Sequence, residues 1–266
     1  MQIFHHQVFL AFLACALVGT AAAQPSEEEE LALIYGDAST LSIATGTQQL
    51  LRRAPSVASV ITAEDIKAMG AQDLDQVLET VPGIHVSRAS IRYASTYVIR
   101  GIYTGQSNPQ VLLMQNGIPM TTSYTADKGY AWVGVPVENI ARIEIIRGPG
   151  SALYGANAYA GVINIITKTA ADTPGTEFGV RDGSFNFKNA WVQHGGQWGA
   201  VDVAAYLNAG STDGSKGIIS QDAGRLHGAT LAPGAVSTGY NSVDASIILA
   251  YDKWRLRTAY KLRNDM

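Results

Sequence analysis

The stretch RIEIIRGPGSALYGANAYAGVINIITK, residues 142–168, decides the fold of this chain. Its two runs rich in β-branched residues, Arg142–Arg147 and Gly161–Thr167, predict two strands. The segment between them contains several glycines, which let a backbone take positive φ and approach other groups closely. A phosphate-binding loop would end in Gly-Lys-Ser/Thr, and a dinucleotide fingerprint would place its third glycine three residues after the second. Gly150 is followed instead by Ser-Ala-Leu-Tyr-Gly, so the spacing excludes both nucleotide loops.

The same stretch resembles the plug-domain signature of TonB-dependent outer-membrane receptors, with matching positions IRGPxSxLYGxxAxxGxINIITK. The resemblance extends upstream over SVASVITAEDI, LDQVLETVPGIHV, VIRG, VLLMQNGIPM and PVENIARIEIIRGP. It implies an α/β plug domain that fills the lumen of a transmembrane β-barrel, a receptor function of binding and passage, and energy from the periplasmic protein TonB. The siderophore and colicin I receptor branch is the most similar. Ferric siderophore is the commonest ligand class in the family, ahead of cobalamin and haem, and no residue decides among them.

The N-terminus predicts an export signal over residues 1–23. Val8–Val18 is a continuous apolar run that is too short to span a bilayer, and Ala21–Ala23 provides small residues before a cleavage site. His5 and His6 stand where Lys or Arg is usual, so a short membrane anchor is the alternative. Cys15, the only cysteine, lies inside the run, so the exported chain would carry neither a disulfide nor a thiolate. Together with the resemblance, this signal predicts a location in the cell outer membrane.

Residues 24–53 read as an acidic lead-in, because Glu27–Glu30 is a charge run of the kind that is usually solvated. A short β-prone segment stands alone within it, and its alternative reading is the first strand of the following domain. The resemblance implies that this segment is a TonB box, which pairs with TonB by strand addition. The candidate box consists of Thr40, Leu41, Ser42, Ile43, Ala44 and Thr45.

Residues 54–170 read as a compact α/β plug domain. Val57–Ile61 predicts a strand that runs into a helix capped by Thr62 and Asp65 and ended by Gly70. A second helix carries an apolar stripe and stops at Pro82-Gly83; the stripe is Leu74, Val77, Leu78 and Val81. Extended segments are expected at Ile84–Arg88 and Tyr97–Arg100, and Asn116-Gly117 predicts a hairpin between Val111–Gln115 and Ile118–Thr121.

Residues 171–266 alternate between apolar and polar positions, as the first strands of an outer-membrane barrel would. In 243–251 the apolar residues fall on one face, and in 254–263 the opposite face is densely charged, which suits lipid outside and a polar lumen inside. Five strands are expected, near 176–181, 185–194, 197–208, 241–251 and 253–263, with a tight turn at Gly195-Gly196 and a long loop over Ala209–Tyr240. A plugged transporter has about twenty-two strands, so we expect an incomplete barrel and an N-terminal fragment of a receptor.

Nothing in the sequence resembles a catalytic constellation, and we expect no enzyme activity, cofactor or bound metal. Ser151 lacks the Gly-x-Ser-x-Gly elbow, and His85, His194 and His227 are isolated. Charged residues make up 15% of the chain and the net charge is −3, which does not favour a nucleic-acid partner. The expected partners are TonB, a metal chelate and outer-membrane lipid.

The resemblance also implies roles for individual residues. Arg100 in VIRG and Arg147 in IRGP match family arginines that pair with glutamates on the barrel wall, a task that suits the guanidinium fork. Apical loops at Ala89–Thr96, Tyr103–Asn108 and Thr122–Tyr130 would meet the ligand. The aromatic contact candidates are Tyr93, Tyr103, Tyr124, Tyr130 and Trp132, which would serve equally well as filling between plug and wall.

Two readings compete with a receptor. The first is a stand-alone exported binding module built from the plug, or a receptor remnant without function. The second is an exported hydrolase, for which no residue gives positive evidence.

Overall fold

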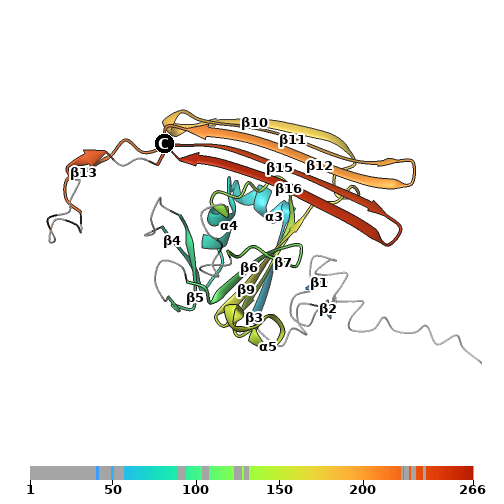
Figure 1. Cartoon of the computed structure of the whole chain (residues 1–266), viewed down its shortest axis with the longest axis horizontal. Coiled ribbons are helices and arrows are strands. Elements are labelled where there is room, and N and C mark those ends of the chain that lie inside the picture. Colours follow the sequence, from blue (N-terminus) through green and yellow to red (C-terminus); the bar gives the residue numbers. More distant parts are fainter. Residues whose placement is uncertain are drawn as a thin grey trace, which may run out of the picture. The chain divides into compact units, whose positions relative to one another are not determined.

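The computed structural model describes residues 40–41, 49–50, 57–88, 94–103, 108–122, 128, 132–222, 224, 228, 232–235 and 238–265. All of them belong to one compact unit, Thr40–Met266. Two five-stranded sheets dominate this unit, as Figure 1 shows. The first sheet belongs to the predicted plug and the second to the predicted wall.

The plug sheet has the strand order β3-β8-β9-β6-β7. Its pairs are antiparallel except β6 with β9, which is parallel. The strands are β3 Val57–Thr62, β6 Val111–Gln115, β7 Ile118–Pro119, β8 Ile140–Arg147 and β9 Gly161–Thr167. The two runs of the opening stretch are therefore the adjacent central strands β8 and β9, as their β-branched composition predicts.

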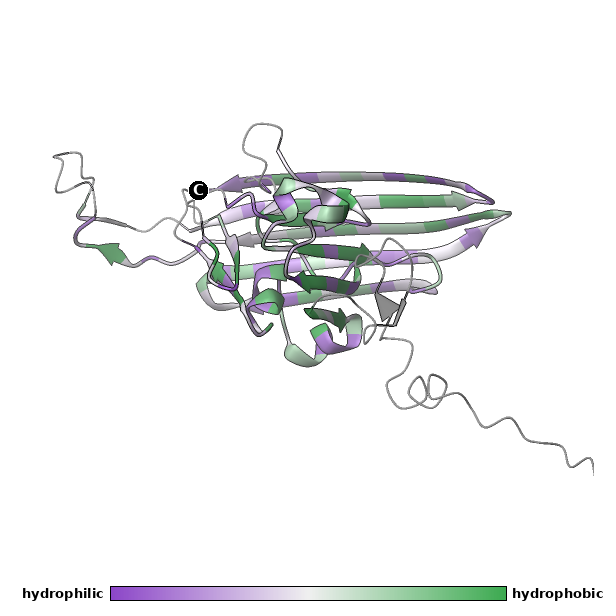
Figure 2. Cartoon of the chain, turned by 90° about the horizontal axis from the view of Figure 1, so that it is seen from below, coloured by the Kyte–Doolittle hydropathy of each residue, from purple (hydrophilic) through white to green (hydrophobic). Residues whose placement is uncertain are grey.

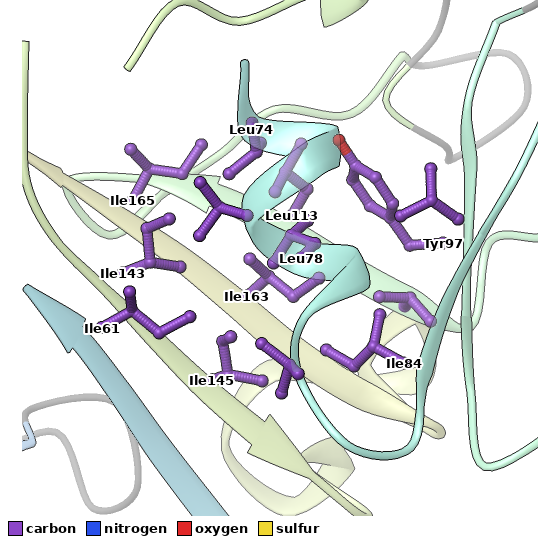
Figure 3. Packing of buried hydrophobic residues seen from close by; sticks show 14 of the residues in the cluster. Ile61, Leu74, Leu78, Ile84, Tyr97, Leu113, Ile143, Ile145, Ile163 and Ile165 are labelled. Carbon is purple, nitrogen blue, oxygen red and sulfur yellow. The ribbon is translucent and has the colours of Figure 1, made fainter. Parts of the chain in front are cut away.

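Two short helices pack on one face of this sheet. In α3, Ala63–Met69, Thr62 and Asp65 form a capping box, and Gly70 ends the helix in the left-handed conformation. In α4, Leu74–Glu79, the N-cap is Asp73, and the predicted apolar stripe is buried. Figure 3 shows Leu74 and Leu78 facing Ile143 and Ile163 of the central strands. The predicted helices and their termination signals are confirmed.

The opposite face of the sheet carries a smaller apolar cluster that includes Leu112, Ile146 and Val162. The Gly-rich segment between β8 and β9 forms α5, Ser151–Tyr154, and the 3-10 turn η6, Ala156–Ala158. Ala158 and Tyr154 of this segment contribute to the cluster. The segment is therefore a cover for one end of the sheet, in agreement with the exclusion of a nucleotide loop.

Two hairpins complete the plug. The strands β4, Ile84–Ser87, and β5, Thr96–Ile99, pair antiparallel where extended segments were expected. The predicted hairpin between β6 and β7 is confirmed, because Asn116 and Gly117 both have positive φ, at 52° and 79°.

The wall sheet has the order β10-β11-β12-β15-β16, and every neighbouring pair is antiparallel. Its strands are β10 Gly175–Gly183, β11 Phe187–Trp198, β12 Val201–Thr212, β15 Tyr240–Tyr251 and β16 Trp254–Asp265. Four of them have 12 residues, which exceeds the length of about 9–11 residues that a transmembrane strand needs. Figure 2 shows hydrophobic and hydrophilic residues alternating along these strands. The expected fold class, an α/β plug followed by antiparallel strands, is confirmed.

The predicted turn at Gly195-Gly196 is wrong. Both glycines lie inside β11, and the turn to β12 falls at Gly199-Ala200, where Gly199 has a φ of 63°. Glycine is needed at position 195 for another reason, because a Cβ there would lie 2.2 Å from the carbonyl oxygen of Thr173. Glycine thus permits a close backbone approach at this position instead of a reversal of the chain.

The loops of the wall differ in length at its two ends. At one end, two residues join β11 to β12, and Asp252-Lys253 join β15 to β16. At the other end, the 3-10 turn η7, Ser184–Asn186, joins β10 to β11, and residues 213–239 connect β12 to β15 and contain the short strands β13 Ile218–Ile219 and β14 Gly234–Ala235. Short turns at one end and a long loop at the other are the habit of outer-membrane barrels. No helix in the described part of the chain is long and apolar enough to cross a membrane.

Candidate functional site

Arg147 lies at the end of β8 and is anchored within the plug. Its Nη1 donates to the carbonyl oxygen of Pro82, and its Nη2 donates to Ser59 Oγ at 2.9 Å. The buried Nε has no acceptor among the described residues. The guanidinium fork is therefore positioned by the plug and still has a donor to offer.

Arg100 follows β5 in the left-handed conformation, with a φ of 54°. Its backbone N–H donates to Gly83 at 2.9 Å, and its exposed side chain places Nη1 3.7 Å from the position of a Cβ on Gly148. Gly148 follows Arg147 directly, so the fold brings the two predicted lock arginines to one end of the plug sheet. No carboxylate among the described residues pairs with either of them.

The aromatic ligand candidates divide into three groups. Tyr103 is 48% exposed beside an apical loop and is free to contact a ligand. Trp132 is partly buried and packs against the main core, which favours a structural contribution. Tyr93, Tyr124 and Tyr130 lie outside the described residues.

A buried polar network connects the flanks of two apical loops to α4. Asp75 is 6% exposed and accepts hydrogen bonds from Ser95 Oγ at 3.0 Å and Tyr97 O–H at 2.8 Å. Lys128 Nζ donates to the same Ser95 hydroxyl at 2.9 Å and lies 5.1 Å from the centroid of the Tyr97 ring. No local pattern in the sequence predicts this network, because its hydrogen-bonded partners are 20 to 33 residues apart.

The protonation states in this network follow from its burial. Burial and the neighbouring Asp75 carboxylate raise the pKa of Tyr97, so the phenol keeps its proton and remains a donor. Burial, followed by repulsion from Asp75, also raises the pKa of Asp73 at the N-cap of α4. At neutral pH the neutral Tyr97 hydroxyl can therefore donate its hydrogen bond to Asp75 and help to hold the loop flanks in place.

The TonB box candidate lies mostly outside the described residues. Thr40–Leu41 forms β1 and pairs antiparallel with β2, Gln49–Leu50. Ser42–Thr45 lie outside the described residues. A backbone of β type at Thr40–Leu41 is compatible with recognition by strand addition.

The described histidines have ordinary polar partners. His85 Nδ1 lies 3.0 Å from Glu79 Oε1, and His194 Nδ1 lies 2.8 Å from Thr176 Oγ1. His227 lies outside the described residues. Across the part of the chain that the structure describes, no group of three or more potential metal ligands occurs.

The plug contacts the wall through the segment before β8. Glu138 pairs with Arg181 of β10 and accepts a hydrogen bond from Tyr206 of β12 at 3.2 Å. Asn139 Nδ2 donates to Ser246 Oγ of β15 at 3.1 Å. No local pattern predicts these contacts either, and the signal that the sequence offers for them is the polar face of each wall strand.

Two cavities lie along this plug–wall contact. One of about 270 Å³ is lined by Trp132, Tyr206, Asp244 and Lys261, among others. The second, of about 340 Å³, is lined by Asn116, Asn164, Arg255 and Arg257, among others. Polar side chains of plug and wall thus face these cavities together with apolar ones such as Val135 and Ile140.

Residues 50–162 match the family model described as the TonB-dependent Receptor Plug Domain. These residues are similar to the plug domain of TonB-dependent receptors. A vitamin B12 transporter of Vibrio vulnificus is 35% identical over 144 residues, which are 54% of this chain and 23% of the relative. The ferric enterobactin receptor PirA of Pseudomonas aeruginosa is 36% identical over 161 residues, with coverage of 55% and 20%.

The solved structures extend the similarity beyond the plug. The siderophore receptor PirA from Pseudomonas aeruginosa superposes with a TM-score of 0.54 at 26% sequence identity. The superposed part is 80% of this chain and 36% of the PirA chain. The ferripyoverdine receptor of the same organism gives 0.62 at 19% identity, with coverage of 84% and 27%, and shows the shared fold. The chain spans about a fifth of the length of the curated relatives it matches.

Proposed function

We propose that this chain supplies the plug and the first wall strands of an outer-membrane receptor that takes up a ferric siderophore with energy from TonB. The observation that carries the proposal is a TonB-dependent plug in contact with the polar face of a sheet of membrane-spanning length. In this proposal residues 1–23 are the signal peptide and 24–53 the lead-in with the TonB box. Residues 54–170 are the plug, and 171–266 begin the barrel.

The outer-membrane location is confirmed by the relatives, which include an iron-regulated outer membrane virulence protein of Vibrio cholerae. The outward apolar positions agree with it, because Phe178 and Val180 of β10 are 80% and 81% exposed and would meet lipid. The stand-alone module is not favoured. The superposition with PirA covers 80% of the chain and must therefore extend past the plug into the wall sheet.

A ferric siderophore as the ligand is supported by two ferric enterobactin receptors of Pseudomonas aeruginosa, which are 36% and 37% identical to this chain over 161 residues. The matched relatives are named as receptors and transporters, in line with a function other than catalysis. The exposed ring of Tyr103 offers a flat amphipathic surface for a large chelate.

Arg100 and Arg147 are proposed to lock the plug to wall glutamates. Their convergence at one end of the sheet and the unsatisfied Nε of Arg147 support this role. In a complete receptor we expect Arg147→Ala to raise passive leakage of small solutes, because one half of the lock is lost.

Uptake measurements test the proposed function. In cells that lack the gene, reintroduction of the intact gene should restore the uptake of radioactive iron from a ferric siderophore such as ferric enterobactin, only while TonB is present. Cyanocobalamin and haem serve as matched probes. Restored uptake of cobalamin alone would overturn the ligand class, and uptake independent of TonB would overturn the mechanism.

A further inference from the structure

One plug carboxylate is held by two different wall strands. The side chain of Glu138, two residues before β8, is only 4% exposed. The Arg181 guanidinium on β10 pairs with one of its oxygens, and the Tyr206 hydroxyl on β12 donates to the other at 3.2 Å. The ion pair on one oxygen and the hydrogen bond on the other together restrict the orientation of the buried carboxylate.

The neighbouring residues extend this contact across the wall. Asn139 donates to Ser246 on β15, and a Cβ on Gly134 would lie 2.9 Å from Arg263 Nη1 on β16. The segment from Gly134 to Asn139 thus meets β10, β12, β15 and β16. It is also the connection between the last apical loop and the central strand β8.

We propose that Glu138, Arg181 and Tyr206 form a releasable latch between the plug and the first wall strands. Its polarity is opposite to that of the lock expected from Arg100 and Arg147, because here the plug supplies the carboxylate and the wall supplies the arginine. The latch acts at the start of β8, whereas Arg147 lies at the end of the same strand. One central strand is therefore fixed at its two ends by two different devices.

The surroundings explain why the latch is releasable. Breaking a fully buried ion pair is costly because the separated charges remain without water. Tyr206 also lines the cavity of about 270 Å³, which is large enough for several water molecules at about 30 Å³ each. Arg181 is itself 33% exposed. Water can therefore reach Arg181 directly and Tyr206 through the cavity when the plug moves, and the contact can form again afterwards.

A cysteine reporter tests the latch in the full chain, refolded in detergent micelles. Ala204 lines the plug–wall contact together with Asn139 and Tyr206, and Cys15 is the only native cysteine. With Cys15→Ser and Ala204→Cys in the background, the rate of maleimide labelling reports how often the contact opens. We expect Glu138→Lys or Arg181→Glu to raise this rate about tenfold or more, because each leaves like charges face to face.

The charge swap E138R/R181E decides between a latch and a merely structural position. We expect it to return labelling to within about threefold of the parent, since Tyr206 can accept as well as donate. If the charge-reversal variants do not fold, Glu138→Gln is measured instead, and we expect it to raise the labelling rate by an intermediate amount. The control swap D213K/K216D alters an exposed loop pair 3.2 Å apart and should leave the rate unchanged.

Unchanged labelling in the single variants, or no rescue by the swap, would overturn the latch. The measurement needs neither ligand nor TonB, so failure of the proposed uptake function would not affect it.

Discussion

Replacement of Gly161 by alanine should destabilise the plug, because the new Cβ would clash with the backbone of the neighbouring strand β8. Gly161 opens β9 beside Arg147 of β8 and Val111 of β6, so its backbone has a strand on either side. A Cβ at this position would lie 2.5 Å from the carbonyl oxygen of Ile146 and 2.5 Å from Cδ1 of Ile99. The isoleucine methyl can rotate away, whereas the carbonyl oxygen belongs to the central strand.

The magnitude follows from that difference. The carbonyl has to move from 2.5 Å to at least 3.0 Å, below which real Cβ contacts essentially do not occur. Overpacking of a rigid site costs about 1–3 kcal/mol, and restriction of the unfolded chain by alanine returns about 0.4–1 kcal/mol. We therefore expect a net loss of about 1 kcal/mol in the free energy of unfolding, or about 0.5 M in the urea midpoint at a slope of about 2 kcal/mol/M.

Urea titration of the full chain in micelles, followed by tryptophan fluorescence, measures this loss. Gly217→Ala is the matched control, because that glycine is exposed and its Cβ would meet only Ser215 Oγ at 3.6 Å. The control should stay within about 0.5 kcal/mol of the parent. If Gly161→Ala also left the free energy of unfolding within about 0.5 kcal/mol of the parent, close packing of β8 and β9 would not require glycine at this position.

Three further outcomes test the plug in the same titration. Leu78→Ala should cost about 2–5 kcal/mol, because the side chain is fully buried between α4 and the sheet. Thr62→Ala should cost about 1 kcal/mol through loss of the capping box of α3, and Thr62→Ser should retain most of it. The Val86 N–H and then His85 lower the pKa of Glu79 below its usual 4.5, so its contribution to stability is present above that pH and is lost as the pH falls through the folded pKa. Glu79→Gln should remove that part of the acid dependence, and an unchanged acid profile would contradict the assignment.

Local signals predicted much of the plug. The capping box at Thr62, the stripe on α4 and the Asn116-Gly117 hairpin each depend on residues within about one turn of one another, and all three are confirmed. The turn at Gly195-Gly196 failed because a glycine pair has two physical uses. The sequence shows the residue type, but only the packing of Thr173 against β11 shows which use applies.

The contacts between plug and wall could not be predicted for a related reason. Glu138 and Tyr206 are 68 residues apart, and Asn139 and Ser246 are 107 apart. Each residue alone reads as a polar position in a loop or on the inner face of a strand. Their partnership exists only after both sheets have formed, so no spacing rule within either sheet reports it.

The resemblance implies a lock in which the plug supplies the positive charge, through Arg100 and Arg147, and the barrel wall supplies the negative charge. The described wall strands contribute arginine and lysine to their polar face, among them Arg181, Arg257 and Lys261. A plug that met Arg181 with another arginine would bring two positive charges close together, where they repel each other. A carboxylate at the start of β8 removes that repulsion for Arg181. It also leaves Arg100 and Arg147, at the other end of the sheet, available for acidic partners. At the start of β8, the negative charge of the plug thus matches the positive charge that the wall presents there.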